Sequence, residues 1–72
     1  MNYYYYGIKD GKLKAFREDC ETVFVPQKRT PVAIVEEGTW YDWDTRKPVA
    51  YEDGEMVYKY GTDIPTLIKS VE

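Results

Sequence analysis

The segment TWYDWD, residues 39–44, contains both tryptophans of the chain and lies between stretches that favour β-strands. The apolar run Val32–Val35 precedes it and is typical of a strand facing a well-filled core. Residues 49–60 follow it and resemble two strands joined by a turn at Asp53-Gly54. This pair, like Asp10-Gly11 earlier in the chain, is a strong hairpin signal because it is flanked by β-favouring residues.

The faces of a strand through residues 39–44 follow from the two-residue period of β structure. Tyr41 and Trp43 would share one face, whereas Trp40, Asp42 and Asp44 would share the other. A thin core can fully bury only one of these faces. We therefore expect one tryptophan in the core and the other at the surface, where tryptophan is a strong anchor for a binding partner.

The size and composition of the chain indicate a single small domain. Its 72 residues have room for one domain, residues 1–72, with a thin hydrophobic core. Aromatic residues make up 17% of the chain, and eight of them are tyrosines. Tyrosine tolerates partial exposure, so this surplus fits either a small sheet with solvent-exposed parts or a binding surface.

Two segments near the ends of the chain have mixed signals. Leu13, Ala15 and Arg17 share one face of the strand predicted after the first turn, and the charge on that face favours an edge strand. Near the C-terminus the alternation of Leu67, Lys69 and Val71 favours a strand, whereas the apolar residues from position 64 onward match helical spacing slightly better.

These signals together predict an all-β or mostly β fold. We expect a small antiparallel meander of five or six short strands, with an SH3-like barrel as one way of closing the sheet. The last segment is expected to be a short C-terminal helix or strand, with the helix favoured.

The charge distribution predicts an electrically two-ended molecule with a net charge of -3. Residues 1–35 carry six basic and four acidic side chains, whereas residues 36–55 carry seven acidic side chains against two basic ones. The acidic balance argues against direct nucleic-acid binding, which depends on a basic surface. An acidic nucleic-acid mimic is one alternative that the charge leaves open.

The cellular compartment is inferred from two features that the sequence lacks, a second cysteine and a long apolar run. Cys20 is the single cysteine and cannot form an intramolecular disulfide, so we expect a reduced thiol. No apolar run has the length of a membrane span or of a signal peptide near Met1. We therefore expect a cytoplasmic protein without membrane contact, and a homo-oligomer remains open.

The residue types needed for common catalytic sites are missing. Without histidine the chain has no Ser-His-Asp or Cys-His arrangement, and it has neither a zinc-ligand set nor a phosphate-binding glycine loop. The pair Asp42 and Asp44 would need a pocket that shifts one pKa, and a short β chain offers little depth for one. We expect no enzyme activity, no cofactor and no metal.

The function that these features favour is non-catalytic protein binding. The expected partner has an apolar pocket rimmed by lysine or arginine. At the level of class, a short acidic domain with aromatic patches and no catalytic residues resembles the accessory proteins of phages and other mobile elements that bind and inhibit host proteins. A small-ligand-binding protein with pockets at homo-oligomer interfaces is the alternative. The predicted partner-binding residues are Trp40, Tyr41, Asp42, Trp43, Asp44, Glu52 and Asp53.

Overall fold

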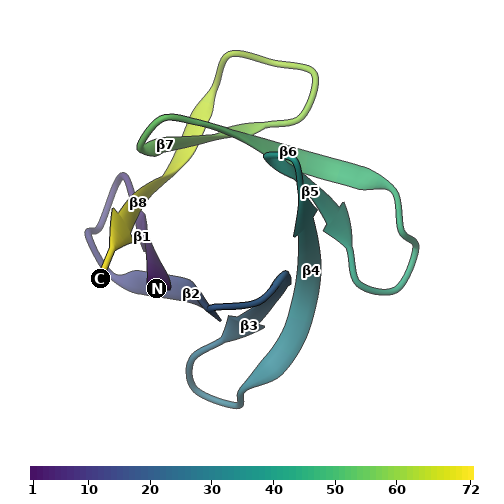
Figure 1. The fold of residues 1–72 in the computed structure, drawn as a ribbon. Coiled ribbons are helices and arrows are strands. Elements are labelled where there is room, and N and C mark those ends of the chain that lie inside the picture. The colour runs from purple at the N-terminus through teal and green to yellow at the C-terminus, as the bar shows by residue number, and fades with distance from the viewer.

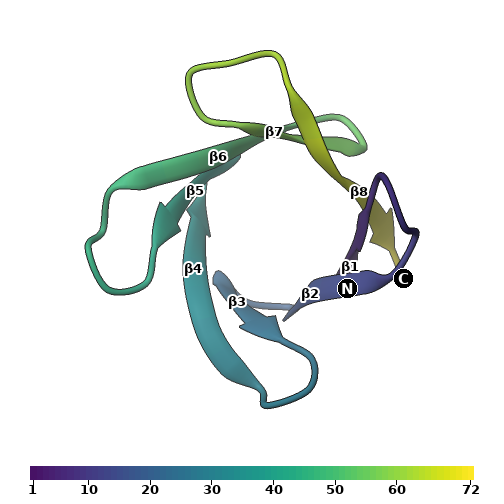
Figure 2. The same cartoon turned by 180° about the vertical axis from the view of Figure 1, so that it is seen from behind.

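A computed structural model describes residues 1–72, which form one antiparallel sheet closed on itself (Figure 1). Each strand pairs with the next strand in the sequence, and the last pairs with the first; Figure 2 shows the same ring from behind. The fold contains no helix, and thus none that could cross a membrane. The strands are β1 (Asn2–Gly7), β2 (Leu13–Glu18), β3 (Thr22–Val25), β4 (Thr30–Glu36), β5 (Thr39–Asp42), β6 (Pro48–Asp53), β7 (Met56–Lys59) and β8 (Pro65–Val71).

The predicted antiparallel meander is confirmed, but the predicted number of five or six strands is wrong. Short segments such as β3 and β5, with four residues each, are complete strands. They persist because closure of the ring gives every strand a hydrogen-bonded neighbour on both sides. For the same reason β2 is no edge strand, since it pairs with both β1 and β3.

The C-terminal segment is a strand, so the favoured alternative of a short helix is wrong. β8 fills the space between β1 and β7 and pairs with both. Without it, these two strands would present unpaired backbone groups to solvent. The hydrogen bonding of β8 to both neighbours thus outweighs the helical spacing of its apolar residues. The alternation of Leu67, Lys69 and Val71 correctly indicates a strand.

The hairpins expected at the two Asp-Gly pairs are present and join β1 to β2 and β6 to β7. In both turns the glycine has a positive φ, 68° at Gly11 and 63° at Gly54. The turn from β4 to β5, expected at residues 36–39, is also present although it has no Asp-Gly pair. It consists of Glu37 and Gly38 with φ of 50° and 83°, and positive φ at both central residues is the mark of a type I′ hairpin turn.

Alternate side chains of every strand fill the barrel. Tyr5, Val23 and Val57 are fully buried at the centre of the core cluster. Small residues face large ones across neighbouring strands, with Ala15 opposite Tyr5 and Ala50 opposite Trp40. Such alternation suits an eight-stranded barrel, whose interior is just wide enough for side chains to fill. The remaining buried core residues are Ala15, Ala33, Val35 and Trp40.

Aromatic side chains on the outer wall form rows across neighbouring strands. Phe16 and Phe24 face each other on β2 and β3, with ring centroids 5.6 Å apart. Tyr51 and Tyr58 stack at 5.2 Å on β6 and β7. Cross-strand aromatic pairs stabilise a sheet, so part of the tyrosine surplus serves the barrel wall.

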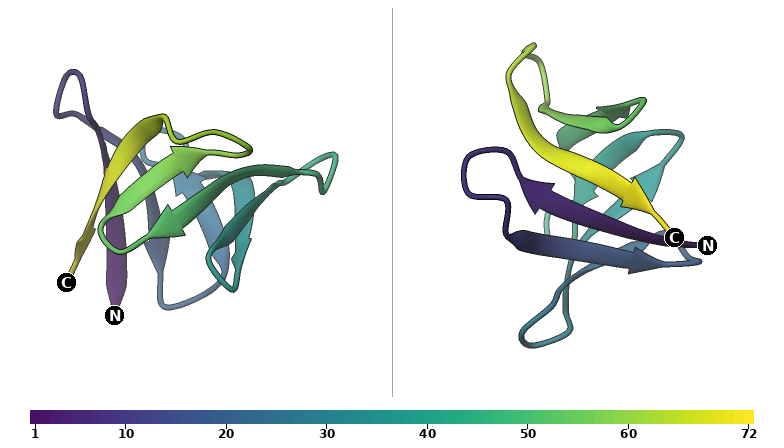
Figure 3. Two further views of the ribbon diagram at one scale, coloured as in Figure 1. Left: turned by 90° about the horizontal axis from the view of Figure 1, so that it is seen from above. Right: turned by 90° about the vertical axis from the view of Figure 1, so that its left-hand side faces the viewer.

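The connections define two different ends of the barrel. The termini and the turns after β2, β4 and β6 lie at one end, which we call the terminal end (Figure 3). There Asn2 and Glu72 exchange two backbone hydrogen bonds of 2.7 and 2.8 Å. The turns after β1, β3, β5 and β7 lie at the other end, which we call the hairpin end.

Candidate functional site

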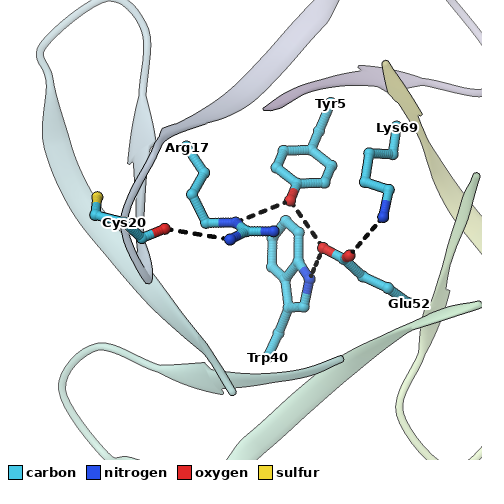
Figure 4. A network of polar contacts seen from close by, with 6 residues as sticks. All are labelled: Tyr5, Arg17, Cys20, Trp40, Glu52 and Lys69. Atoms are coloured by element: carbon cyan, nitrogen blue, oxygen red, sulfur yellow. Dashed lines mark hydrogen bonds and ion pairs between the residues drawn. The ribbon is translucent and has the colours of Figure 1, made fainter. Parts of the chain in front are cut away.

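A network of polar side chains occupies the barrel interior, with the carboxylate of Glu52 at its centre (Figure 4). Its Oε2 accepts hydrogen bonds from the Tyr5 hydroxyl and the Trp40 indole N–H, both at 2.8 Å. Its Oε1 accepts one from Lys69 Nζ at 3.1 Å. Arg17 extends the network by donating to the Tyr5 oxygen at 3.2 Å and to the backbone oxygen of Cys20 at 3.2 Å.

This interior network brings together residues from five different strands. Tyr5 and Trp40 also meet edge to face, with ring centroids 4.8 Å apart. No buried side-chain nitrogen or oxygen of the protein lacks a hydrogen-bond partner. Because an unpaired polar group inside a barrel is costly, a fully connected network specifies how the strands assemble.

The Tyr5 hydroxyl is held in its neutral form. Burial raises the pKa of Tyr5 well above its ordinary value, and the neighbouring Glu52 carboxylate adds to the rise. The hydrogen bond from Arg17 acts in the opposite direction but does not prevail. The phenol therefore remains a donor to Glu52 at neutral pH.

Two of the seven residues predicted to contact a partner lie inside the barrel. Trp40 is 6% exposed, and the side chain of Glu52 is 7% exposed. In this fold neither side chain is available at the outer surface, and Trp40 is the one of the two tryptophans that fills the core. Strand alternation explains their position, since β5 places Trp40 inward and Tyr41 outward, and β6 places Glu52 inward and Tyr51 outward.

Asp53 is separated from the tryptophan segment by the length of β6. It lies next to the turn from β6 to β7 at the terminal end, whereas residues 43–47 form the turn from β5 to β6 at the hairpin end. At 3.2–3.4 Å per residue, the six-residue strand holds the two positions about 16 Å apart. The predicted residues therefore do not form one continuous surface.

The remaining predicted residues meet at the turn from β5 to β6. Asp42 organises this turn, because its Oδ2 accepts hydrogen bonds from the backbone N–H groups of Asp44 and Thr45 at 3.1 and 3.0 Å. These bonds lower the pKa of Asp42, and the bond from Thr45 has the larger effect. Asp42 is thus a structural residue of the turn, and Asp44 is the exposed acid beside it.

Trp43 is held firmly although it lies outside the strands. The backbone N–H of Trp43 donates to the backbone oxygen of Val32 at 3.0 Å. The guanidinium of Arg46 lies 4.9 Å from the centroid of the indole ring. The backbone N–H of Arg46 in turn donates to the backbone oxygen of Asp42 at 2.9 Å. The half-buried indole is therefore presented on an ordered turn, with the Arg46 guanidinium beside it.

A small hollow adjoins Arg46 on this turn. It has a volume of about 180 Å³ and is lined by Ile34, Glu36, Tyr41 and Arg46. We call the hollow and its surroundings the turn patch, defined by residues Ile34, Glu36, Tyr41, Trp43, Asp44 and Arg46.

Acidic and basic side chains are distributed unequally between the two ends of the barrel. This distribution agrees only in part with the charge difference between residues 1–35 and 36–55 of the sequence. The hairpin end carries four acids, Asp10, Asp42, Asp44 and Asp63, and eight exposed basic residues, Lys9, Lys12, Lys14, Lys28, Arg29, Arg46, Lys47 and Lys59. Arg17 and Lys69 lie within the barrel, and Arg29 forms an ion pair with Glu18 at 2.7 Å, so Arg29 is the exposed basic side chain that reaches the terminal end. Its eight exposed acids are Glu18, Asp19, Glu21, Glu36, Glu37, Asp53, Glu55 and Glu72.

The largest cavity lies at the hairpin end, where no site was predicted. It measures about 520 Å³ and separates the turn after β1 from the start of β8. All of its lining residues belong to a single chain. We call it the hairpin cleft, lined by Gly7, Ile8, Lys9, Asp10, Lys14, Ile64, Pro65, Thr66 and Leu67.

No three histidine, cysteine, aspartate or glutamate side chains gather into a group that could hold a metal ion. Comparison with protein-family models, curated proteins and solved structures finds no match to this chain. The function is therefore inferred from the geometry of the barrel and its surface.

Proposed function

We propose that this protein is a non-catalytic protein-binding domain and that the turn patch is its contact surface. The observation that carries the proposal is the position of Trp43, a half-buried indole held on an ordered turn outside the barrel core. Its neighbour Trp40 already supplies the tryptophan of the core. Packing of the core therefore does not account for the second indole.

The turn patch has the properties of an interface centre. Tryptophan, tyrosine and arginine dominate binding energy at protein interfaces. All three occur here, since Arg46 lies over the Trp43 ring and lines the hollow together with Tyr41. The turn is fixed by hydrogen bonds before a partner arrives, so little conformational entropy is lost on binding. The adjacent hollow could receive one side chain of the partner.

The chemistry of the patch defines the partner that we propose. An apolar pocket would receive the Trp43 indole, and a lysine or arginine at the rim would meet Asp44. Arg46 and Lys47 add positive charge to the same turn, so the rim of the partner would also carry an acid. A host protein inhibited by a phage or mobile-element accessory protein fits this description by analogy of class alone.

The non-catalytic part of the proposal is supported by the state of the buried carboxylate. Glu52 accepts hydrogen bonds from three donors inside the barrel, and its side chain is hardly exposed. General acid or base catalysis needs a carboxyl group within reach of a substrate. Glu52 is instead committed to the fold.

Site-specific photo-crosslinking tests the proposal. The photoreactive residue p-benzoylphenylalanine at position 43 should cross-link one protein in a lysate of the source cells, and excess unlabelled wild type should compete. The matched control carries the same residue at position 62, in the turn after β7, and should give no such product. If excess Trp43→Ala competed as well as wild type, the turn patch would not be the contact surface.

A second candidate function is favoured by the charges at the terminal end. Glu18 is paired with Arg29 and Asp19 with the N-terminal amine, which leaves six exposed acids without an ion pair. These six could imitate the phosphates of a nucleic acid toward a basic protein. Duplex DNA and raised salt should then release the captured partner, and the double variant Glu37→Gln/Glu55→Gln should bind it more weakly. Loss of capture on Trp43→Ala, with no effect of DNA, would instead favour the turn patch.

A further inference from the structure

The hairpin cleft lies away from the turn patch and has no role in the proposed function. Its volume of about 520 Å³ falls within the range of 300–1,000 Å³ that is usual for small-molecule sites. Its walls come from two segments far apart in sequence, the turn after β1 and the start of β8. The cleft consequently exists only when the barrel is closed.

The lining combines apolar surface with positive charge. Ile8, Ile64 and Leu67 provide apolar surface, and Ile8 and Ile64 are 38% and 58% exposed. Exposed isoleucines beside a cavity of this size leave apolar surface in water that a ligand could cover. The charged lining residues are Lys9, Asp10 and Lys14.

The two lysines of the cleft differ in their partners. Lys14 Nζ forms an ion pair with Asp10 at 2.8 Å, and Asp10 also accepts a hydrogen bond from the backbone N–H of Lys12. Lys9 forms no ion pair. The cleft thus offers one unpaired ammonium group, and a second is available to a ligand that competes with Asp10.

The surrounding field favours an anion at this position. The cleft opens at the hairpin end, where basic side chains outnumber acids, and the terminal end with its eight acids lies across the barrel. A charge separation of this kind directs small anions to the positive end. We propose that the hairpin cleft binds a small monocarboxylate with an apolar tail, its carboxylate on Lys9 and its tail against Ile8 and Ile64.

Titration of the ¹⁵N-labelled full chain with octanoate, followed by NMR, tests this site. Octanoate should shift the amide signals of Gly7–Lys9 and of the residues around Ile64–Leu67. Octylamine has the same tail with the opposite charge, and acetate has the charge without the tail. Both should therefore bind at least about 10-fold more weakly, which corresponds to about 1.4 kcal/mol. Equal binding of octylamine, or shifts outside the cleft, would overturn the proposal.

Paired variants separate the two parts of the site. Lys9→Ala and Ile64→Ser should each weaken octanoate binding several-fold, whereas Lys28→Ala and Val49→Ser, at exposed positions outside the cleft, should not. Asp10→Asn keeps an oxygen for the Lys12 N–H but releases Lys14, so it should tighten binding. Unchanged affinity in Lys9→Ala and Asp10→Asn would show that no ammonium group holds the carboxylate.

Discussion

The Trp40 indole N–H donates to the Glu52 carboxylate at 2.8 Å inside the barrel, and this contact links the core to the polar network. The two residues project inward from adjacent strands, β5 and β6. From the opposite wall Tyr5 contacts both, through an edge-to-face ring contact with Trp40 and a hydrogen bond to Glu52. The centre of this small barrel is therefore held by directional contacts as well as by apolar packing.

Replacing one partner of the Glu52–Lys69 ion pair should lower the free energy of unfolding more than replacing both partners. Glu52→Gln leaves the largely buried ammonium of Lys69 without its charged partner, and we expect a loss of about 2–3 kcal/mol in the free energy of unfolding. The double variant Glu52→Gln/Lys69→Met removes that unpaired charge and should recover part of the loss. Chemical denaturation of the wild type, both single variants and the double variant measures the coupling; strictly additive losses would argue against it.

Alkaline pH should destabilise the barrel through Tyr5. Its pKa is raised on folding, so the neutral hydroxyl is favoured in the folded state relative to the unfolded one, where the pKa is near 10. The resulting stabilisation is complete below pH of about 10 and is lost as the pH rises above that value. Tyr5→Phe cannot lose a proton, so its thermal stability should fall less steeply above pH 10, although it should be lower at pH 7 because Glu52 and Arg17 lose a partner. Identical alkaline profiles for both proteins would contradict this assignment.

The two tryptophans should respond in opposite ways to truncation. Trp40→Ala removes a large side chain from the core and should cost about 3–5 kcal/mol, enough to unfold most molecules of a domain this small. Trp43→Ala removes a half-buried ring from a turn and should leave the chain folded. Thermal melts followed by circular dichroism distinguish the two variants, and unfolding of both would show that Trp43 belongs to the core.

Asp42 and Asp44 provide a second matched pair, within the turn itself. Asp42→Ala removes the acceptor of two backbone N–H groups and should loosen residues 43–46, whereas Asp44→Ala should leave the turn ordered. The pKa of Asp42 is lowered on folding, so its contribution is present above pH of about 4 and is lost as the pH falls further. Amide hydrogen exchange of Thr45 and Arg46 measures how well ordered the turn is in each variant. Equal protection in both variants would rule out the structural role of Asp42.

Local patterns in the sequence were sufficient to predict the β class and the hairpins at Asp10-Gly11 and Asp53-Gly54. Closure into a barrel was expected only as one way to complete the sheet, and the pairing of β1 with β8 that closes it was not predictable, because these strands lie at opposite ends of the chain. The helical spacing of residues 64–71 was misleading for the same reason. Local preference was weaker than the need of two strands for a common neighbour.

The interior network left only a faint signal in the sequence. Pattern rules assign charged side chains to the outside, yet Arg17 follows Leu13 and Ala15 in phase, and Lys69 lies in phase between Leu67 and Val71. In each case the charge on an apolar face marked an inward position, where the side chain bonds to Tyr5 or Glu52. The partner of each charge lies on a distant strand, so the pairing itself could not be read from spacing.

The affinity of the cross-linked partner for wild type and for Trp43→Ala is the most direct test of the proposed contact surface. If the Trp43 indole anchors the complex, the variant should bind about 30-fold or more weakly, a loss of about 2 kcal/mol, while its melting curve stays close to that of the wild type. Equal affinity of the two folded proteins would contradict the assignment of binding to the turn patch.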